Sequence, residues 1–379
     1  MIYYKDVEKI TLEDVESLIE NEIPENALLE YKRELKIQKG DERKEFLKDV
    51  SAFANSRGGL FIFGIQESDE GNPEEIVGIE AENTDKKLLQ IQEIICSGIE
   101  PIINNAKIRF LKIKDNKHIL LIKIFRSWNL PHRVCYKKSD KFFIRRNNQV
   151  SRITIEELKM MFTGNEELKE KIFKFRDSRI AKKNTVFPKQ TLYLHVVPIQ
   201  SFYEEYKFDL SVLEKAIQNN PLIRSLQKKY NFDGLNYINL NIPLIKSIQI
   251  FRDGKIELII NLQIQDQEML NLIPVAWINN ALYDHVRNIF NFYNKIEILP
   301  PFLILMTCNN FLGKKIHLHN SVFIYDDNVF SENTLKFPDI LIENVQEYVP
   351  ERILPVLDLL WQACGYEKCK YPIKEKNQR

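Results

Sequence analysis

The sequence of 379 residues lacks the features of secreted and membrane-spanning proteins. It contains only five cysteines, an odd number and widely scattered, which argues against a disulfide framework. No apolar run approaches the ~20 residues that a membrane-spanning helix needs, and the first residues do not have the pattern of a signal peptide. We therefore expect a cytoplasmic protein with reduced thiols and no contact with a membrane.

Other absences exclude particular kinds of site. The chain shows no internal repeat, no low-complexity segment and no obvious helix-turn-helix motif. Cys364 and Cys369, with His317 and His319, match no zinc module in their spacing, so we expect idle thiols and no zinc site. The glycines in residues 55–59 come after a predicted helix and before a strand, the reverse of the order in a phosphate-binding loop. We expect them to end the helix in a left-handed conformation and to provide a tight entry to the sheet, and we do not expect ATP binding.

The length and composition fit a folded protein with more than one domain. With 379 residues, 44% hydrophobic and 28% charged, the chain is long enough for two or three domains. Helical and strand patterns predict an α+β fold, with an N-terminal mixed sheet covered by helices and a second α+β domain. We predict a nucleic-acid-associated domain at 1–165, a charged helical connection at 166–190, and a domain at 191–379 that serves as a sensor or in oligomerisation.

The first candidate site is a half-buried strand. Read with a period of two, the apolar Leu29 and Tyr31 face one side, and Glu30 and Lys32 face the other. The two charged groups start about 7 Å apart along the strand, since the rise is about 3.3 Å per residue. Such a pair can hold a hard cation and a phosphate oxygen together. The alternative is a solvated polar face with an ion pair worth about 0.2–1 kcal/mol.

Charge is distributed very unevenly along the chain. Residues 1–100 carry 12 Lys and Arg against 24 Asp and Glu, whereas residues 101–190 carry 23 against 8. The basic segment is either a surface that binds a polyanion or the counter-charge of the acidic segment within one domain. Alternation along residues 141–146 favours Arg145 over Arg146 as the outward-facing residue. The candidate nucleic-acid-binding residues are Arg133, Lys137, Lys138, Lys141, Arg145 and Arg146.

Several short motifs occur in a fixed order. They are Glu25-x4-Glu30-x-Lys32, Ser51-Ala52-Phe53-Ala54-Asn55 with Gly58-Gly59, Gly64-Ile65, Val77-Gly78-Ile79, and Phe142-Phe143-Ile144-Arg145-Arg146. In this order they resemble the Schlafen AlbA-type domain, from about residue 20 to about residue 163. In that family a helix ending in Ala-Asn-x-x-Gly-Gly leads into a central strand, and an aromatic strand ends in arginine.

The resemblance implies a metal-dependent nuclease for structured RNA, since animal Schlafens of this type cut transfer and ribosomal RNA. It implies a carboxylate triad of Glu25, Glu30 and Glu67, with Asp69 as the alternative third acid, and Mg²⁺ or Mn²⁺ as the cofactor. Lys32 completes the catalytic set. The chain lacks the zinc-binding Cys/His cluster of the animal proteins. It also has one such domain where they have two fused lobes, so we expect a homo-oligomer, in the simplest case a homodimer.

The chemistry of phosphodiester cleavage favours the same residues. Cations held by carboxylates stabilise charge on the phosphate and lower the pKa of a bound water, and oxygen ligands suit a hard cation. Lys32 is placed to neutralise the developing phosphorane or to orient the water. His132 is either an acid or base within reach of the site, or a surface or packing histidine.

Three functions from different classes follow. The first is a divalent-metal-dependent endoribonuclease that cleaves structured RNA such as tRNA, in antiphage defence or a stress response. The second is a regulator that binds RNA or DNA through the basic segment without cutting it. The third is a sensor or interaction protein whose first domain is an inactive relative of the nuclease. The pair of glutamates favours the first.

Overall fold

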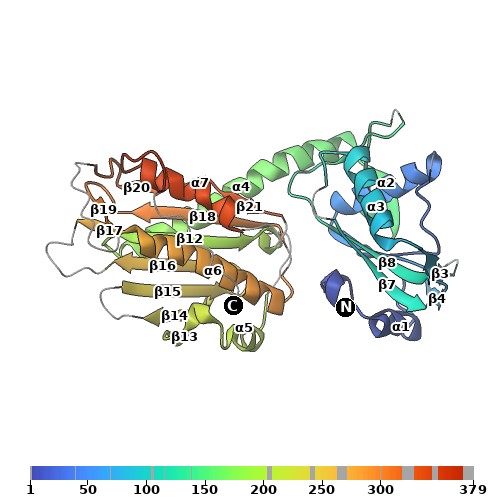
Figure 1. Cartoon of the computed structure of the whole chain (residues 1–379), viewed down its shortest axis with the longest axis horizontal. Helices are drawn as coiled ribbons and strands as arrows, with labels where there is room; N and C mark the ends of the chain where they lie inside the picture. Colours follow the sequence, from blue (N-terminus) through green and yellow to red (C-terminus); the bar gives the residue numbers. More distant parts are fainter. Residues whose placement is uncertain are drawn as a thin grey trace. The chain divides into compact units, whose positions relative to one another are not determined.

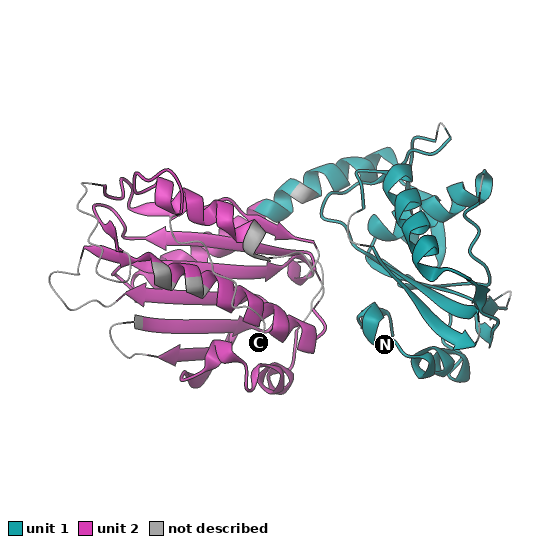
Figure 2. Cartoon of the chain, viewed as in Figure 1, with its two compact units in different colours: residues 1–169 teal, residues 170–379 magenta. Residues whose placement is uncertain are grey.

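The computed structural model divides into two compact units, residues 1–169 and 170–379 (Figure 2). Each unit combines helices with β-sheet, which confirms the α+β prediction. The structure describes residues 2–38, 40–68, 70–103, 106–114, 116–137, 139–202, 207–239, 244–262, 271–298, 300–317, 328–343 and 349–369. Within these residues no helix is both long and apolar enough to cross a membrane.

The main sheet of unit 1 is mixed. Its order is β1 (Leu29–Lys32), β2 (Gly58–Phe63), β8 (Lys117–Phe125) and β5 (Ile79–Glu80), and β7 (Lys107–Lys114) also pairs with β8. β1 runs parallel to β2, and β8 is antiparallel to each of its partners. β2 is buried along its whole length, because it is apolar throughout and has helices over both of its faces.

Alternation along β2 separates the core of unit 1 into two layers. Leu60 and Ile62 pack in the layer that contains α1 (Leu12–Glu20), whereas Phe61 and Phe63 pack in the layer that contains α2 (Asp41–Ala54) and α3 (Thr84–Gly98). Figure 1 shows α1 and the α2–α3 pair on opposite sides of the sheet. Glu30 lies in register with Phe61 on the neighbouring strand. Its side chain therefore points into the α2 layer.

A smaller sheet packs against α2 and completes this layer. Its order is β11 (Gln149–Arg152), β10 (Lys141–Arg146), β9 (Arg133–Val134) and β6 (Ile99–Glu100), and β10 lies directly on α2. A hairpin of β3 (Ile65–Glu67) and β4 (Pro73–Ile76) follows β2. The small sheet and the hairpin both contact the strand that carries Glu30 and Lys32. Arg145 of β10 reaches Glu30, and β3 lies against β1.

The paired glycines give the tight entry into the sheet that the sequence predicts, but they are not the end of α2, so that part of the prediction was wrong. The helix ends at Ala54, its C-cap is Asn55 with right-handed backbone angles, and the glycines are the first residues of β2. Gly58 has a φ of +74°, and a Cβ there would lie 2.6 Å from the carbonyl oxygen of Ile124. A Cβ on Gly59 would lie 2.0 Å from the ring of Phe53. Glycine is needed here because the strand passes very close to its neighbours.

One helix belongs to both units. α4 (Ile155–Asn184) is continuous over 30 residues, and the division between the units falls within it. The predicted boundary at residue 165 and the first part of the predicted connection at 166–190 therefore lie inside this helix. Its C-terminal part is fixed to unit 2 by Arg179, which donates to both oxygens of Glu257 at 2.9 and 2.8 Å.

Unit 2 is built on an eight-stranded sheet. Its order is β13 (Gln227–Asn231), β14 (Gly234–Asn239), β15 (Leu244–Phe251), β16 (Ile256–Leu262), β12 (Thr191–Pro198), β18 (Phe302–Asn309) and β20 (Thr334–Lys336), with β21 (Ile340–Ile342) also on β18. β17 (Leu272–Pro274) and β19 (Lys315–His317) form a separate parallel pair. One face of the large sheet carries the main core of the unit, with α5 (Leu210–Ile217), α6 (Val275–Lys295) and α7 (Val349–Gln362).

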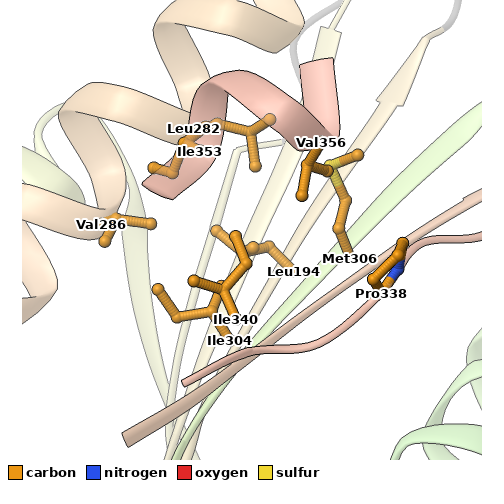
Figure 3. A pocket seen from close by; sticks show the side chains of 9 residues that line it. All are labelled: Leu194, Leu282, Val286, Ile304, Met306, Pro338, Ile340, Ile353 and Val356. Atoms are coloured by element: carbon orange, nitrogen blue, oxygen red, sulfur yellow. The ribbon is translucent and has the colours of Figure 1, made fainter. Parts of the chain in front are cut away.

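A small cavity lies in this core, between the sheet and the helices α6 and α7. Its volume is about 10 Å³, and its lining is apolar, as Figure 3 shows for Leu194, Met306 and Val356. An ordered water needs roughly this much space together with two to four polar partners. Because the lining offers no such partners, we interpret the cavity as a packing gap and not as a ligand site.

We predict that Gly59→Ala destabilises unit 1 by about 1–3 kcal/mol, because the added methyl group overpacks the Phe53 ring. The measurement is the urea dependence of amide hydrogen exchange in β2 peptides. Gly164→Ala is the matched control, since a Cβ there meets no atom within 4 Å and alanine favours the helix by up to about 1 kcal/mol. Equal exchange in the Gly59 variant and the parent would contradict the close approach.

Candidate active site

A tight turn brings Glu25 beside the strand that carries Glu30. Asn26 and Leu29 exchange backbone hydrogen bonds of 3.1 and 3.3 Å, which folds the chain back on itself. The backbone N–H of Glu25 donates to the carbonyl of Gly71 at 3.0 Å, and its Oε1 accepts from the N–H of Tyr31 at 2.8 Å. The two glutamates of the sequence motif are therefore neighbours in space.

Glu30 is buried, with 6% of its surface exposed. Its Oε1 forms an ion pair with Lys32 Nζ, and its Oε2 lies 2.6 Å from Nη2 of Arg145. The predicted shared face of Glu30 and Lys32 is thus present, but it is not a solvated face. Burial disfavours the charge on Lys32, and the adjacent carboxylate of Glu30 more than compensates, so the pKa of Lys32 is raised.

Arg145 lies inside the domain and not on its surface. It is 5% exposed, Nε and Nη2 donate to the carbonyl of Asn26 at 3.2 and 3.0 Å, and the guanidinium lies 4.7 Å from the centre of the Phe53 ring. The prediction that Arg145 faces outward was therefore wrong. Alternation showed that Arg145 and Arg146 face opposite ways, but it could not show which face α2 covers.

Glu67 at the end of β3 supplies a third carboxylate to the same region. Burial, followed by the charge of Glu30, raises the pKa of Glu25 to about 8; the hydrogen bond from Tyr31 lowers it, and the charge of Glu67 raises it further. Oε2 of Glu67 is buried and accepts no hydrogen bond from the described residues. Asp69, the alternative third acid, lies outside the described residues.

Asp49 is a fourth carboxylate, and sequence reasoning missed it. It lies on α2, and burial, followed by the charge of Glu30, raises its pKa to about 6. The available signal was its place in the helix: it lies three residues after Phe46 and four before Phe53, on the apolar stripe that packs on the sheet. A charged residue at such a position is worth examining as a site residue.

The donor set agrees with a hard divalent cation in its chemistry. Glu25, Glu30 and Glu67 offer only oxygen ligands. Oε2 of Glu67 is buried without a hydrogen-bond donor in the described part of the chain, whereas both oxygens of Glu30 are ion-paired, with Lys32 and Arg145. Within that part no three His, Cys, Asp or Glu side chains stand together in an arrangement that could hold a metal ion. Cation binding would therefore have to draw these carboxylates together.

Part of the basic segment is neutralised by acids of the same unit. Arg133 pairs with Glu100 at 2.6 Å and with Asp140 at 3.3 Å, and Arg146 pairs with Glu157. Lys138 lies outside the described residues. Among the six candidate nucleic-acid-binding residues, those with described positions and no ion pair to a described residue are Lys137 and Lys141.

Aromatic and basic groups lie together on the side of α2 that carries β9 and β10. Arg43 is 5.6 Å from the centre of the Tyr136 ring, and Lys48 is 6.0 Å from that of Phe143. The side chain of Lys137 reaches the N-terminus of α2. Its Nζ lies beside Gly40, the N-cap residue, where it would be 3.4 Å from a Cβ on that glycine. Phe143 is buried, so Tyr136, which is partly exposed, is the ring of this group that a base can reach. Cations beside an accessible ring are typical of surfaces that bind single-stranded nucleic acid.

His132 has a packing role. It is 1% exposed, its Nδ1 lies 2.6 Å from the carbonyl oxygen of Pro101, and burial lowers its pKa. The amide of Asn55 donates to the carbonyls of His132 and Phe143, both at 2.8 Å, and accepts from the N–H of His132 at 2.7 Å. The side chain of Asn55 therefore joins the end of α2 to the loop that contains His132 and to β10.

Comparison with known proteins gives one family match and low structural similarity. Residues 25–154 match the family model described as Schlafen, AlbA_2. A search of the curated proteins finds no match. Two solved structures are similar to 37% of this chain. One is the DIP2311 protein of Corynebacterium diphtheriae, with 15% identity, a TM-score of 0.26 and 25% of its own length covered. The other is the N-terminal domain of a RecG-related protein from Nitrosomonas europaea, with 19% identity, a TM-score of 0.27 and 92% covered.

These TM-scores are too low to carry an argument, and the chain spans about a quarter of the DIP2311 protein. The family match is different, because it extends from Glu25 through β11 and contains all four carboxylates as well as Lys32 and Arg145. Residues 25–154 of this chain therefore form a Schlafen AlbA-type domain, as the sequence resemblance predicted.

Proposed function

We propose that unit 1 is a divalent-metal-dependent endoribonuclease that acts on structured RNA such as tRNA, in antiphage defence or a stress response. The Schlafen AlbA_2 match supports a nucleic-acid-related function for this unit. The observation that carries the enzymatic proposal is the state of Glu25, whose pKa is raised to about 8 by burial and by neighbouring carboxylates. Mutually repelling buried acids cost stability, and they cluster at functional sites.

Glu25, Glu30 and Glu67 are the residues that would hold the cation, Mg²⁺ or Mn²⁺. When bound, such a cation neutralises charge on the phosphate and lowers the pKa of a water ligand. The backbone N–H of Tyr31 keeps the carboxylate of Glu25 in place. Lys32 keeps its proton, because the adjacent Glu30 raises its pKa, and it offers positive charge to the phosphorane. Asp49, with a pKa of about 6, can accept a proton near neutral pH.

The RNA partner is proposed to cross the basic and aromatic side of α2. Lys137 and Lys141 supply charge there, and Tyr136 supplies a ring on which a base can stack. The preference for structured RNA over DNA comes from the family resemblance, and DNA is a substrate to test beside it. A second copy of the chain, in a homodimer, would supply the second lobe that the animal proteins contain.

A regulator that binds nucleic acid without cutting it is the second candidate. The observation in its favour is that Glu30 is occupied by Lys32 and Arg145 in the structure, and that the described carboxylates do not yet surround a common point. A sensor or interaction protein with an inactive first unit is the third. Cleavage and binding assays distinguish the three.

We expect purified protein to cleave tRNA in Mg²⁺ or Mn²⁺ and not in chelator. Glu30→Gln should lower the cleavage rate at least about 100-fold, because it removes a charged ligand from the site. Glu34→Gln, an exposed glutamate of the same segment, is the control and should change the rate less than about twofold. Metal-dependent binding or salt-sensitive binding without cleavage, in the parent protein, would favour the regulator instead. If the protein neither binds nor cleaves RNA, the sensor or interaction protein is the candidate that remains.

Reversal of Lys137 and Lys141 to glutamate should weaken RNA binding about tenfold or more at low salt and reduce the slope of log affinity against log salt concentration. The measurement is a salt series of fluorescence-anisotropy titrations. The control is the same reversal at Lys112 and Lys114, which are exposed on β7. If the two double variants lose equal affinity, the site on α2 is rejected in favour of a general charge effect.

We expect the stability of unit 1 to fall as pH rises from about 4.5 to about 8. The folded state keeps the proton of Glu25 to a higher pH than the unfolded state, where the pKa returns to 4.5, so ionisation opposes folding in this interval. Amide exchange of β2 peptides, corrected for the intrinsic rate, should therefore show less protection at pH 8 than at pH 5. Glu25→Gln should reduce this trend to the smaller part that the raised pKa of Asp49 causes, and Mg²⁺ should reverse it. An unchanged trend in Glu25→Gln would show that another group is responsible.

A further inference from the structure

Arg145 connects four parts of unit 1 that meet at the candidate active site. Its own strand is β10, and its backbone N–H donates to Oγ of Ser56 at 2.8 Å, just after α2. Its guanidinium lies over Phe53 of α2, donates to the turn before β1, and faces the carboxylate of Glu30 on β1. Arg145 therefore contacts α2, the turn before β1 and Glu30 itself.

The hydrogen bonds of the guanidinium hold the turn and not the carboxylate. Nη2 has two N–H groups, and they donate to the carbonyls of Asn26 at 3.0 Å and Leu29 at 3.4 Å. Its 2.6 Å contact with Oε2 of Glu30 is an ion pair without hydrogen-bond alignment, which is why that oxygen has no donor. The planar guanidinium thus fixes the turn between Glu25 and Glu30 and places a positive charge against Glu30 at the same time.

We infer that Arg145 is a positioning residue, which sets the geometry of Glu25 and Glu30 for the reaction and makes no contact with RNA. Its side chain is 1% exposed, so RNA cannot reach it, whereas the side chain of Lys32 is 36% exposed. The catalytic part of this inference rests on the proposed nuclease function. The coupling between Arg145 and Glu30 does not, because it is a property of the folded unit.

The test is a double-mutant cycle in the full chain with Arg145→Met, Glu30→Gln and the combined variant. Unit 1 stability is read from the urea dependence of amide exchange in β2 peptides. Loss of Arg145 should shift the urea midpoint down strongly when Glu30 is charged and much less in the Glu30→Gln background. If Arg145→Met does not fold, the same cycle is run with Arg145→Gln, which also removes the charge but can still donate a hydrogen bond to the turn. Arg146→Met, on the exposed side of the same strand, is the control and should show no coupling to Glu30.

Cleavage kinetics provide the second readout. For Arg145→Lys we expect kcat to fall about 100-fold while KM stays within about twofold, because a misplaced carboxylate slows the chemical step without removing an RNA contact. Compared with Arg145→Met, the variant Arg145→Lys should restore a larger share of the urea midpoint than of kcat. The reason is that lysine restores the charge but not the planar guanidinium.

The possible failures are distinguishable. Additive effects of Arg145 and Glu30 on the urea midpoint would overturn the inference whether or not the protein cleaves RNA. A rise in KM that accounts for the whole loss of activity would also overturn it, in favour of direct RNA contact. Strong coupling in a protein that cleaves no RNA would overturn the proposed function and leave the positioning of the turn and of Glu30 by Arg145 in place.

Discussion

The burial of the Glu30 carboxylate between two cations is the constraint on which the first unit depends. Moving a carboxylate out of water costs several kcal/mol even after the surroundings relax, and the loss of one partner of a buried pair costs about 3–5 kcal/mol. Here the compensating charges come from Lys32 on the same strand and from Arg145, 115 positions further along the chain. The small sheet that contains β10 has to pack on α2 for Arg145 to reach this place. The position of that sheet is therefore coupled to the state of one carboxylate.

The same pair shows how the uneven charge of the sequence is used. Four cations of the basic segment pair with acids of the first hundred residues, so much of the asymmetry is neutralised within unit 1. These pairs are Lys107 with Asp6, Arg109 with Glu8, Arg133 with Glu100, and Arg145 with Glu30. The two interpretations of the basic segment therefore both apply, to different residues. A surface for a polyanion is confined to the cations that remain, such as Lys137 and Lys141 beside α2.

Local patterns of the sequence were sufficient for the strand that carries Glu30 and Lys32 and for their shared face, because alternation depends only on neighbouring residues. They failed where the answer depends on what covers a strand. Alternation alone favoured Arg145 as the outward residue, whereas the packing of α2 and the Asn26 turn, 119 residues away, makes Arg145 the buried one. Asp49 was missed because its proximity to Glu30 depends on the packing of α2 against β1, which no local pattern shows. The paired glycines were expected both to end the helix and to provide a tight entry to the sheet; the structure shows the tight entry, while α2 ends before them at Ala54.

Unit 2 provides an internal standard for interpreting Glu25. Glu257 is also buried, and burial alone would raise its pKa, but hydrogen bonds from Arg179 and His195 and their charges lower it to about 2. A carboxylate compensated in this way stays ionised, and it serves to fix α4 on the sheet. Glu25 has one backbone hydrogen bond and acidic neighbours, so its pKa moves the other way, to about 8. Near neutral pH such a group keeps its proton, and under the proposed function a bound cation would displace that proton. A structural role for Glu25 would be served better by a glutamine, whereas exchange between a proton and a cation requires a carboxylate.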